Sequence, residues 1–173
     1  MSLTERAKEW AIARHEGTNH LYDGQPYAIH LTHVVRVAIQ WLHLIPQEAQ
    51  DEVIAACCLH DTIEDCRVTY NDVKNEFGEK VAELVYALTN LKGRNRKERA
   101  GHEYYRGIRD VQYATFVKIC DRIANIEHSV NTRSSMLQAY QKEKKDFWLE
   151  LYMEPYVPMF EYIESIILTT PTL

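Results

Sequence analysis

The feature that most constrains this chain is helical periodicity that runs through most of its length. Apolar residues recur three or four positions apart, as one face of an α-helix requires, and the most apolar run is Val-Ile-Ala-Ala-Cys-Cys at 53–58. No stretch shows the apolar–polar alternation of a half-buried strand, and the 173 residues include only six Gly and five Pro. The sequence therefore predicts an all-α fold, a bundle of about eight to ten helices, several of them short.

Turn-forming residues divide the chain into expected helices. These cover residues 3–15, 31–44, 46–61, 69–77, 79–90, 110–130, 134–152 and 156–168, with 94–106 partly helical. Thr69 and Asp72 have the spacing of a capping box, whereas 17–26 is rich in turn formers and is expected to be a loop. At this length we expect a single domain over 1–173, with a core at about 3–130 and C-terminal helices over 131–173.

Charge and composition exclude several classes of protein. The formal net charge is -5, whereas proteins that bind long nucleic acids are usually basic. No run of about 18 apolar residues predicts a membrane span. The first residues are polar rather than signal-like, and the four cysteines contain no CxxC pair. We therefore expect reduced cysteines, a cytoplasmic location and no membrane partner.

The sharpest motif is Leu-His-Asp-Thr-Ile-Glu-Asp at 59–65, where the most apolar helix ends. On a helix, His60 and Glu64 share one face, as do Asp61 and Asp65. Burying such groups without partners costs free energy, and a divalent cation would supply the opposing charge. Taken alone, a His-Asp pair is also common at the surface end of a helix.

Two distant segments carry residues of the same kind. His30 follows a Gly-Gln-Pro-Tyr turn, and Asp121 interrupts an otherwise apolar helix. Lys118 and Asn125 lie one turn to either side of Asp121 and would extend a polar stripe on that helix. Two imidazoles and two carboxylates form a mixed nitrogen and oxygen site that suits Mn²⁺, Fe²⁺ or Zn²⁺ and leaves room for water and a phosphate oxygen.

The order His30, His60-Asp61, Asp121 resembles the H…HD…D signature of the HD superfamily, and the wider context resembles the hydrolase domain of the RelA/SpoT type. The similarity covers roughly residues 3–130. The matching pieces are Gly24 to Tyr27 before His30, the 59–65 motif, Phe77-Gly78 with Val81, Leu84-Val85 and Thr89, and Lys118 with Asp121-Arg122 and Asn125.

The resemblance implies a metal-dependent phosphohydrolase. Members of that group remove pyrophosphate from the 3′ position of guanosine tetra- and pentaphosphate with Mn²⁺, and small animal relatives are associated with NADPH 2′-phosphatase activity. It implies that the metal is bound by His30, His60, Asp61 and Asp121, with Mn²⁺ the expected ion and Fe²⁺, Zn²⁺, Co²⁺ or Mg²⁺ as alternatives. Glu64 and Asp65 would position or deprotonate the attacking water, and Asn125 and Lys118 would contact a phosphorylated nucleotide.

Two features bear on the substrate. The family usually has Arg-Lys-Ser shortly before its Gly-x-Pro-Tyr turn, whereas this chain has Leu21-Tyr22-Asp23, in which Tyr22 could stack on a base. The segment 90–106 concentrates cations in an acidic chain. It is either a solvated surface or a basic flap that neutralises phosphates; the cations are Lys92, Arg94, Arg96, Lys97, Arg99 and Arg106.

The residues leave alternatives open. One is an HD 5′-nucleotidase or an NADPH 2′-phosphatase-like enzyme, and another is a non-enzymatic module that senses a nucleotide. The complete set of four expected ligands and two acids favours an enzyme. The aromatic-rich stretch between Tyr140 and Phe160 is expected to pack between helices, and a homodimer surface there is the alternative.

Overall fold

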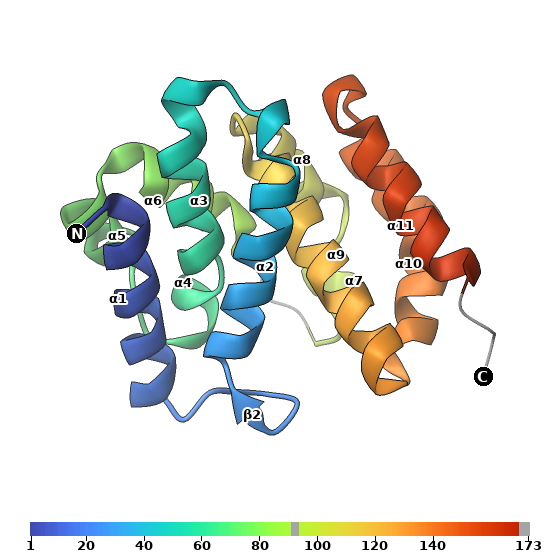
Figure 1. Ribbon diagram of the computed structural model, residues 1–173, viewed down its shortest axis with the longest axis horizontal. Coiled ribbons are helices and arrows are strands. Elements are labelled where there is room, and N and C mark those ends of the chain that lie inside the picture. Colours follow the sequence, from blue (N-terminus) through green and yellow to red (C-terminus); the bar gives the residue numbers. More distant parts are fainter. Residues whose placement is uncertain (91–93, 170–173) are drawn as a thin grey trace.

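The computed structural model describes residues 1–90 and 94–169, and it confirms the all-α prediction (Figure 1). The α-helices are α1 Leu3–Gly17, α2 Ala28–Gln40, α3 Gln50–Leu59, α4 Thr62–Asp65, α5 Tyr70–Phe77, α6 Glu79–Leu88, α7 Arg96–Arg99, α8 His102–Asp110, α9 Ala114–Thr132, α10 Met136–Leu151 and α11 Val157–Thr169. Short 3-10 helices are η1 Leu42–Leu44, η2 Gln47–Ala49 and η3 Glu154–Tyr156, and a minimal hairpin joins β1 Leu21–Tyr22 to β2 Gln25–Pro26.

Helix α3 lies at the centre of the N-terminal part of the bundle. It packs against α1, α2, α6 and α9, and every residue from Val53 to Leu59 is buried. A helix that is apolar on all sides is expected only where neighbours surround it. In Figure 1, α1, α3, α2 and α9 follow one another across the molecule, so the C-terminal end of α3 lies inside the fold.

Helices α10 and α11 pack against the remaining face of α9. Their aromatic side chains meet in the core, where the ring centroids of Phe147 and Phe160 are 6.1 Å apart. The predicted packing role of this aromatic stretch is confirmed for most of its residues, although Tyr152 is exposed. Within 1–90 and 94–169, none of the helices is both long and apolar enough to cross a membrane.

Local chemistry accounts for most helix boundaries. Thr69 and Asp72 form the predicted capping box, and Gly78 stops α5 with a φ of 90°. Helix α2 covers Ala28–Gln40 and so begins and ends earlier than expected. It ends early because the chain tightens into η1 after Trp41. Helix α9 begins at Ala114 rather than at 110, because Tyr113 has a left-handed backbone (φ 69°).

The hairpin at 21–26 was missed, since this segment was expected to be a loop. Leu21 pairs with Pro26 and Tyr22 with Gln25, and the two residues between the strands, Asp23 and Gly24, both have positive φ. Asp-Gly is a preferred pair for a two-residue hairpin turn. The ladder is so short that it gives no alternation pattern, and the turn residues were its only sequence signal.

The packing of α2 gives a direct test of the fold. Leu31 is fully buried, whereas Ile39 on the same helix is 60% exposed. We expect Leu31→Ala to lower the free energy of unfolding by about 2–5 kcal/mol through lost burial and a residual cavity. Ile39→Ala, the matched control, is expected to change it by no more than about 0.5 kcal/mol. Urea denaturation followed by circular dichroism measures both, and equal effects would contradict this packing.

Candidate metal centre

Three segments that are distant in sequence meet at the C-terminal end of α3. His30 lies in the first turn of α2, His60 follows the last residue of α3, and Asp121 lies within α9. All three side chains are buried. Because α3 packs against both α2 and α9, the three segments converge on one point although they are far apart in sequence.

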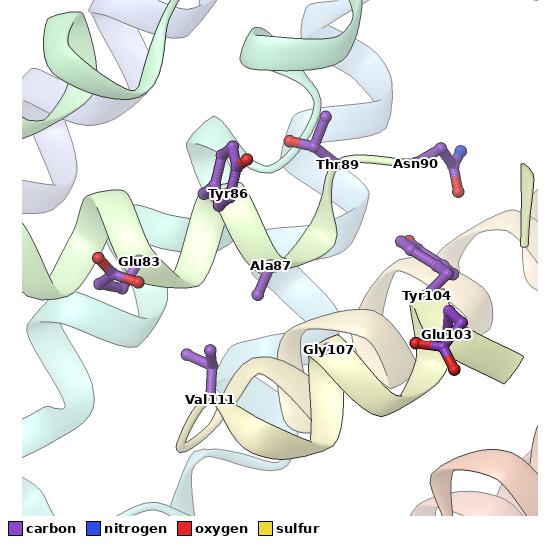
Figure 2. Close-up of a pocket in the computed structure, with 9 residues that line it drawn as sticks. All are labelled: Glu83, Tyr86, Ala87, Thr89, Asn90, Glu103, Tyr104, Gly107 and Val111. Carbon is purple, nitrogen blue, oxygen red and sulfur yellow. The ribbon is translucent and has the colours of Figure 1, made fainter. Parts of the chain in front are cut away.

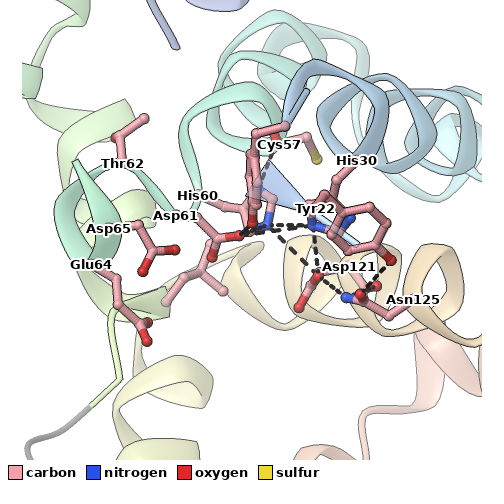
Figure 3. Close-up of polar contacts among 12 residues, drawn as sticks. Tyr22, His30, Cys57, His60, Asp61, Thr62, Glu64, Asp65, Asp121 and Asn125 are labelled. Carbon is pink, nitrogen blue, oxygen red and sulfur yellow. Dashed lines mark hydrogen bonds and ion pairs between the residues drawn. The ribbon is translucent and has the colours of Figure 1, made fainter. Parts of the chain in front are cut away.

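The ligand atoms of these residues face one another (Figure 3). The Nε2 atoms of His30 and His60 are 3.3 Å apart, and Asp121 Oδ1 lies 3.3 Å from the first and 3.7 Å from the second. One ligand atom from each of the three residues lies within 4.8 Å of the other two. Among the described residues, this is the cluster of His, Cys, Asp or Glu side chains whose ligand atoms are close enough to share a metal ion. The predicted convergence of His30, His60 and Asp121 is therefore present in the structure.

The orientation of His60 suits a metal ligand. Its Nδ1 lies 2.9 Å from the carbonyl oxygen of Cys57, so Nδ1 donates a hydrogen to that carbonyl, and in the neutral ring the lone pair is on Nε2. Two imidazole nitrogens and a carboxylate oxygen at such short separations repel one another unless a positive charge lies between them. The donor set and its burial therefore fit a divalent cation.

Asp61 adjoins this cluster on the His60 side. Its Oδ2 lies 2.9 Å from His60 Nε2 and 3.8 Å from His30 Nε2, and it also accepts a hydrogen bond from the Tyr27 hydroxyl. A carboxylate oxygen this close to both imidazoles is within reach of a shared cation. Its role as the fourth ligand remains a prediction.

The charges of the cluster are strongly coupled. Burial alone raises the pKa of Asp121, but Lys118 and the two imidazoles outweigh it and hold that pKa well below its usual value. Burial alone lowers the pKa of His60, but Asp61 and Asp121 outweigh it and raise that pKa well above the usual range. A cation bound between these groups would compete with a proton on His60.

The two predicted water-positioning acids lie on α4, the short helix that follows Asp61. Glu64 accepts hydrogen bonds from the backbone nitrogen and the side-chain amide of Asn90, at 3.1 and 3.0 Å. Asp65 points toward Asp61 in Figure 3. Burial and the neighbouring carboxylates of Asp61 and Glu64 raise the pKa of Asp65 to about 6, against the partial opposition of His20 and His60. A carboxyl group with this pKa suits proton transfer near neutral pH.

The other predicted residues around Asp121 are tied to it. Lys118 Nζ donates to Asp121 Oδ2 at 3.0 Å, and Asn125 Nδ2 donates to Asp121 Oδ1 at 2.5 Å. Tyr22 donates to Asn125 Oδ1 at 2.9 Å and stacks on His30 with centroids 4.6 Å apart. In this state Tyr22 and Lys118 therefore support the predicted ligands, His30 and Asp121.

Two arginines of the basic segment are paired with glutamates. Arg96 pairs with Glu143 on α10 at 2.5 Å, and Arg94 pairs with Glu98 at 3.2 Å. Arg99 is exposed, whereas Lys92 and the side chain of Lys97 lie outside the described part of the chain. A phosphate that binds Arg96 therefore has to compete with the Glu143 carboxylate.

A mostly apolar pocket of about 350 Å³ lies between α6 and α8 (Figure 2). None of the predicted metal ligands lines it. It nevertheless adjoins the centre, because Asn90 on its rim binds Glu64, and the ring of Tyr104 faces the Lys118 ammonium at 5.8 Å.

Sequence reasoning missed three residues beside the centre. Tyr27 donates to Asp61, His15 stacks on Tyr27 with centroids 4.0 Å apart, and His20 lies 3.7 Å from Asp65. The available signal was local composition, since 15–30 holds three of the eight histidines. Histidines without a recognised spacing could not be assigned to the centre.

Comparison with known proteins identifies the class. The family model described as HD domain matches residues 7–152. The chain therefore belongs to the HD domain family, as its motifs predicted. HD-domain hydrolases bind divalent metals, and the His/Asp cluster of this chain is a possible site for one.

Individual relatives agree with this assignment. The guanosine-3′,5′-bis(diphosphate) 3′-pyrophosphohydrolase of Aquifex aeolicus (strain VF5) is 31% identical over 159 residues, which are 90% of this chain but 20% of that protein. The enzyme of the same name in Danio rerio, MESH1, is 30% identical over 118 residues, covering 68% of this chain and 63% of that protein. The chain thus spans about a fifth of the bacterial protein.

A solved structure described as a metazoan ortholog of SpoT that hydrolyses ppGpp has the same fold. Its TM-score is 0.76, with 19% sequence identity, and the match covers 100% of this chain and 98% of the other. The C-terminal helices α10 and α11 are therefore part of the shared architecture.

The raised pKa of Asp65 predicts a stability cost at neutral pH. The pKa is about 6 in the folded protein against 3.8 ordinarily, so the folded state favours the protonated carboxyl, and stability falls as pH rises between these values. We expect Asp65→Asn to raise the free energy of unfolding of the metal-free protein at pH 8 by about 1–2 kcal/mol, after allowance for solvent screening. The gain should vanish below about pH 4.

Urea denaturation at pH 8 and pH 4 measures this effect. Asp146→Asn, at an exposed position on α10, is the control and is expected to be neutral at both pH values. A destabilised Asp65→Asn protein at pH 8 would contradict the assigned environment.

Proposed function

We propose that this protein is a metal-dependent phosphohydrolase that acts on a phosphorylated nucleotide, with guanosine 3′,5′-bis(diphosphate) 3′-pyrophosphohydrolase activity as the leading assignment. One observation carries the proposal: buried His30, His60 and Asp121 converge within 4.8 Å, and an acid of raised pKa, Asp65, lies beside them. Membership of the HD domain family and the names of the relatives in Aquifex aeolicus and Danio rerio support it.

In this proposal His30, His60, Asp61 and Asp121 hold one divalent ion, with Mn²⁺ as the expected metal. When bound, such an ion polarises a phosphoryl oxygen and lowers the pKa of a water molecule. Lys118 offsets the negative charge of Asp121, and Tyr27 fixes the carboxylate of Asp61.

Asp65 and Glu64 act on the attacking water. Asp65 accepts its proton, because the pKa of about 6 leaves most of the carboxyl ionised at pH 7 while keeping it basic. Glu64, held by Asn90, orients the same water. In guanosine 3′,5′-bis(diphosphate) the water attacks the phosphorus bound to the 3′ oxygen. The bond between that phosphorus and the 3′ oxygen breaks, pyrophosphate leaves, and the 3′ oxygen takes a proton to become a hydroxyl. A monophosphate would release phosphate by the same exchange of bonds.

Substrate contacts are assigned to residues around this centre. Asn125 and Tyr22 face the sugar or base once Tyr22 leaves His30, and Lys118 remains close to the phosphates. Arg94, Arg96, Lys97 and Arg99 supply further positive charge as a flap. The ion pair between Arg96 and Glu143 opposes this movement, so phosphate must compete with a carboxylate.

The proposal also covers the location, domain number and oligomeric state of the protein. All four cysteines are free and buried, which supports a reducing, cytoplasmic setting. We assign the whole chain to a single domain. A homodimer is the alternative to a monomer; Leu149 on α10 is 67% exposed, but a single exposed leucine is also normal on a monomer.

The first test is turnover of a nucleotide panel. With added Mn²⁺ we expect pyrophosphate release from guanosine 3′,5′-bis(diphosphate), and loss of that activity in excess EDTA. NADPH and deoxynucleoside monophosphates are the comparison substrates, followed by phosphate release. Preference for NADPH or for a monophosphate would replace the leading substrate, and binding without turnover of any of them would support a sensing module.

The second test measures the metal site without turnover. Mn²⁺ at 100 times its dissociation constant is expected to stabilise the wild-type protein by about 2.7 kcal/mol, seen as a rise in Tm. His30→Ala should abolish the rise. His33→Ala, one turn along the same helix and outside the cluster, should retain it. Equal responses of the two variants would remove His30 from the site.

The third test separates metal ligands from water-positioning acids. We expect Asp61→Ala to lose Mn²⁺ binding and turnover together. Glu64→Ala should bind Mn²⁺ like the wild type but lower kcat by about 10²–10⁴-fold, because it loses only the orientation of water. Calorimetric Mn²⁺ titration and steady-state kinetics report the two effects, and normal turnover of Glu64→Ala would exclude Glu64 from the mechanism.

A further inference from the structure

Three aromatic rings form a stack between α1 and the acids of α4. His15 and His20 both stack on Tyr27, with centroids 4.0 and 4.3 Å away. Tyr27 in turn donates its hydroxyl to Asp61. This ring stack of His15, His20 and Tyr27 fixes the position of His20, which comes from the turn between α1 and β1.

One hydrogen bond joins the two histidines. Their Nδ1 atoms are 3.0 Å apart, so one ring donates a hydrogen and the other accepts it. His15 is buried, and burial lowers its pKa to about 4, which keeps it neutral at physiological pH. A neutral His15 can serve as the acceptor at Nδ1.

Asp65 decides which ring donates. Its Oδ2 lies 3.7 Å from the same His20 Nδ1. An ionised carboxylate repels a ring lone pair and attracts an N–H group, so the hydrogen is favoured on His20. In the described part of the chain, no hydrogen bond to the Asp65 carboxylate is formed, and His20 is the basic side chain paired with it.

We propose that His20 is a positioning residue: its Nδ1–H, which donates to His15 Nδ1 in this structure, turns toward Asp65 when substrate is bound and keeps this carboxylate aimed at the reacting water, while the stacked His15 ring fixes the plane of the His20 ring. The proposal deepens the proposed function and rests on it for the role of Asp65. The separation of 3.7 Å exceeds a hydrogen bond, and such contacts often tighten only when substrate is bound.

The kinetic test uses a rescue. His20→Leu removes the donor and is expected to lower kcat by about 10- to 100-fold, the effect of losing one hydrogen bond to a charged group, with little change in KM. His20→Asn places an amide N–H near the position of Nδ1–H and should restore most of the rate. His15→Leu should lower kcat by less, because His20 keeps its donor but loses its orientation.

His43→Leu, at an exposed position on η1, is the control and should match the wild type. A His20→Asn protein as slow as His20→Leu would overturn the role of the N–H donor. A full-rate His20→Leu protein would remove His20 from the mechanism.

A second measurement needs no turnover. In ¹⁵N-labelled, metal-free protein, His20 is expected to carry its hydrogen on Nδ1 at neutral pH, with a resonance that shifts in Asp65→Asn but not in Asp146→Asn. A hydrogen on Nε2 alone, or no response to Asp65→Asn, would refute the pairing. If the wild type hydrolyses no nucleotide, the proposed function fails, and the spectrum still decides the contact between His20 and Asp65.

Discussion

The whole centre depends on one electrostatic constraint: two imidazoles and a carboxylate are buried with their acceptor atoms face to face. The Nε2 atoms of His30 and His60 are 3.3 Å apart, and Asp121 Oδ1 lies within 3.7 Å of both. Such an arrangement persists only if positive charge is supplied. Lys118 supplies part of it from α9, and a proton or a divalent cation must supply the rest. The fold therefore holds a site whose electrostatics favour cation binding.

Each part of the bundle contributes to that constraint. The apolar helix α3 brings His60 and Asp61 into the interior, and α2 and α9 bring His30 and Asp121 against them. Around these residues lies a second set of contacts, between Cys57 and His60 and between Tyr27 and Asp61, that fixes the direction of the His60 and Asp61 side chains. A metal centre needs both sets, because ligand atoms that rotate freely lose affinity for the ion.

The acids of α4 show why burial and chemistry are connected. Partial burial and the nearby carboxylates of Asp61 and Glu64 raise the pKa of Asp65 to about 6. A carboxyl group with this pKa can accept a proton near pH 7. Asp65 is paired with His20 and Glu64 with Asn90, two loop residues that are far apart in sequence. Residues from two loops therefore contact the carboxylates of both acids, whereas α4 supplies only their backbone.

The sequence by itself determined the helical class through its periodicity and the capping box at Thr69 through the spacing to Asp72. Its resemblance to the H…HD…D signature also identified the three residues that converge, His30, His60 and Asp121. Tertiary structure alone decided what surrounds them. The Asp23-Gly24 hairpin places Tyr22 on His30, the ring stack brings His20 to Asp65, and Arg96 turns to Glu143. These contacts join residues that are distant in sequence or that lie in irregular turns, where no periodicity records which side chain faces which.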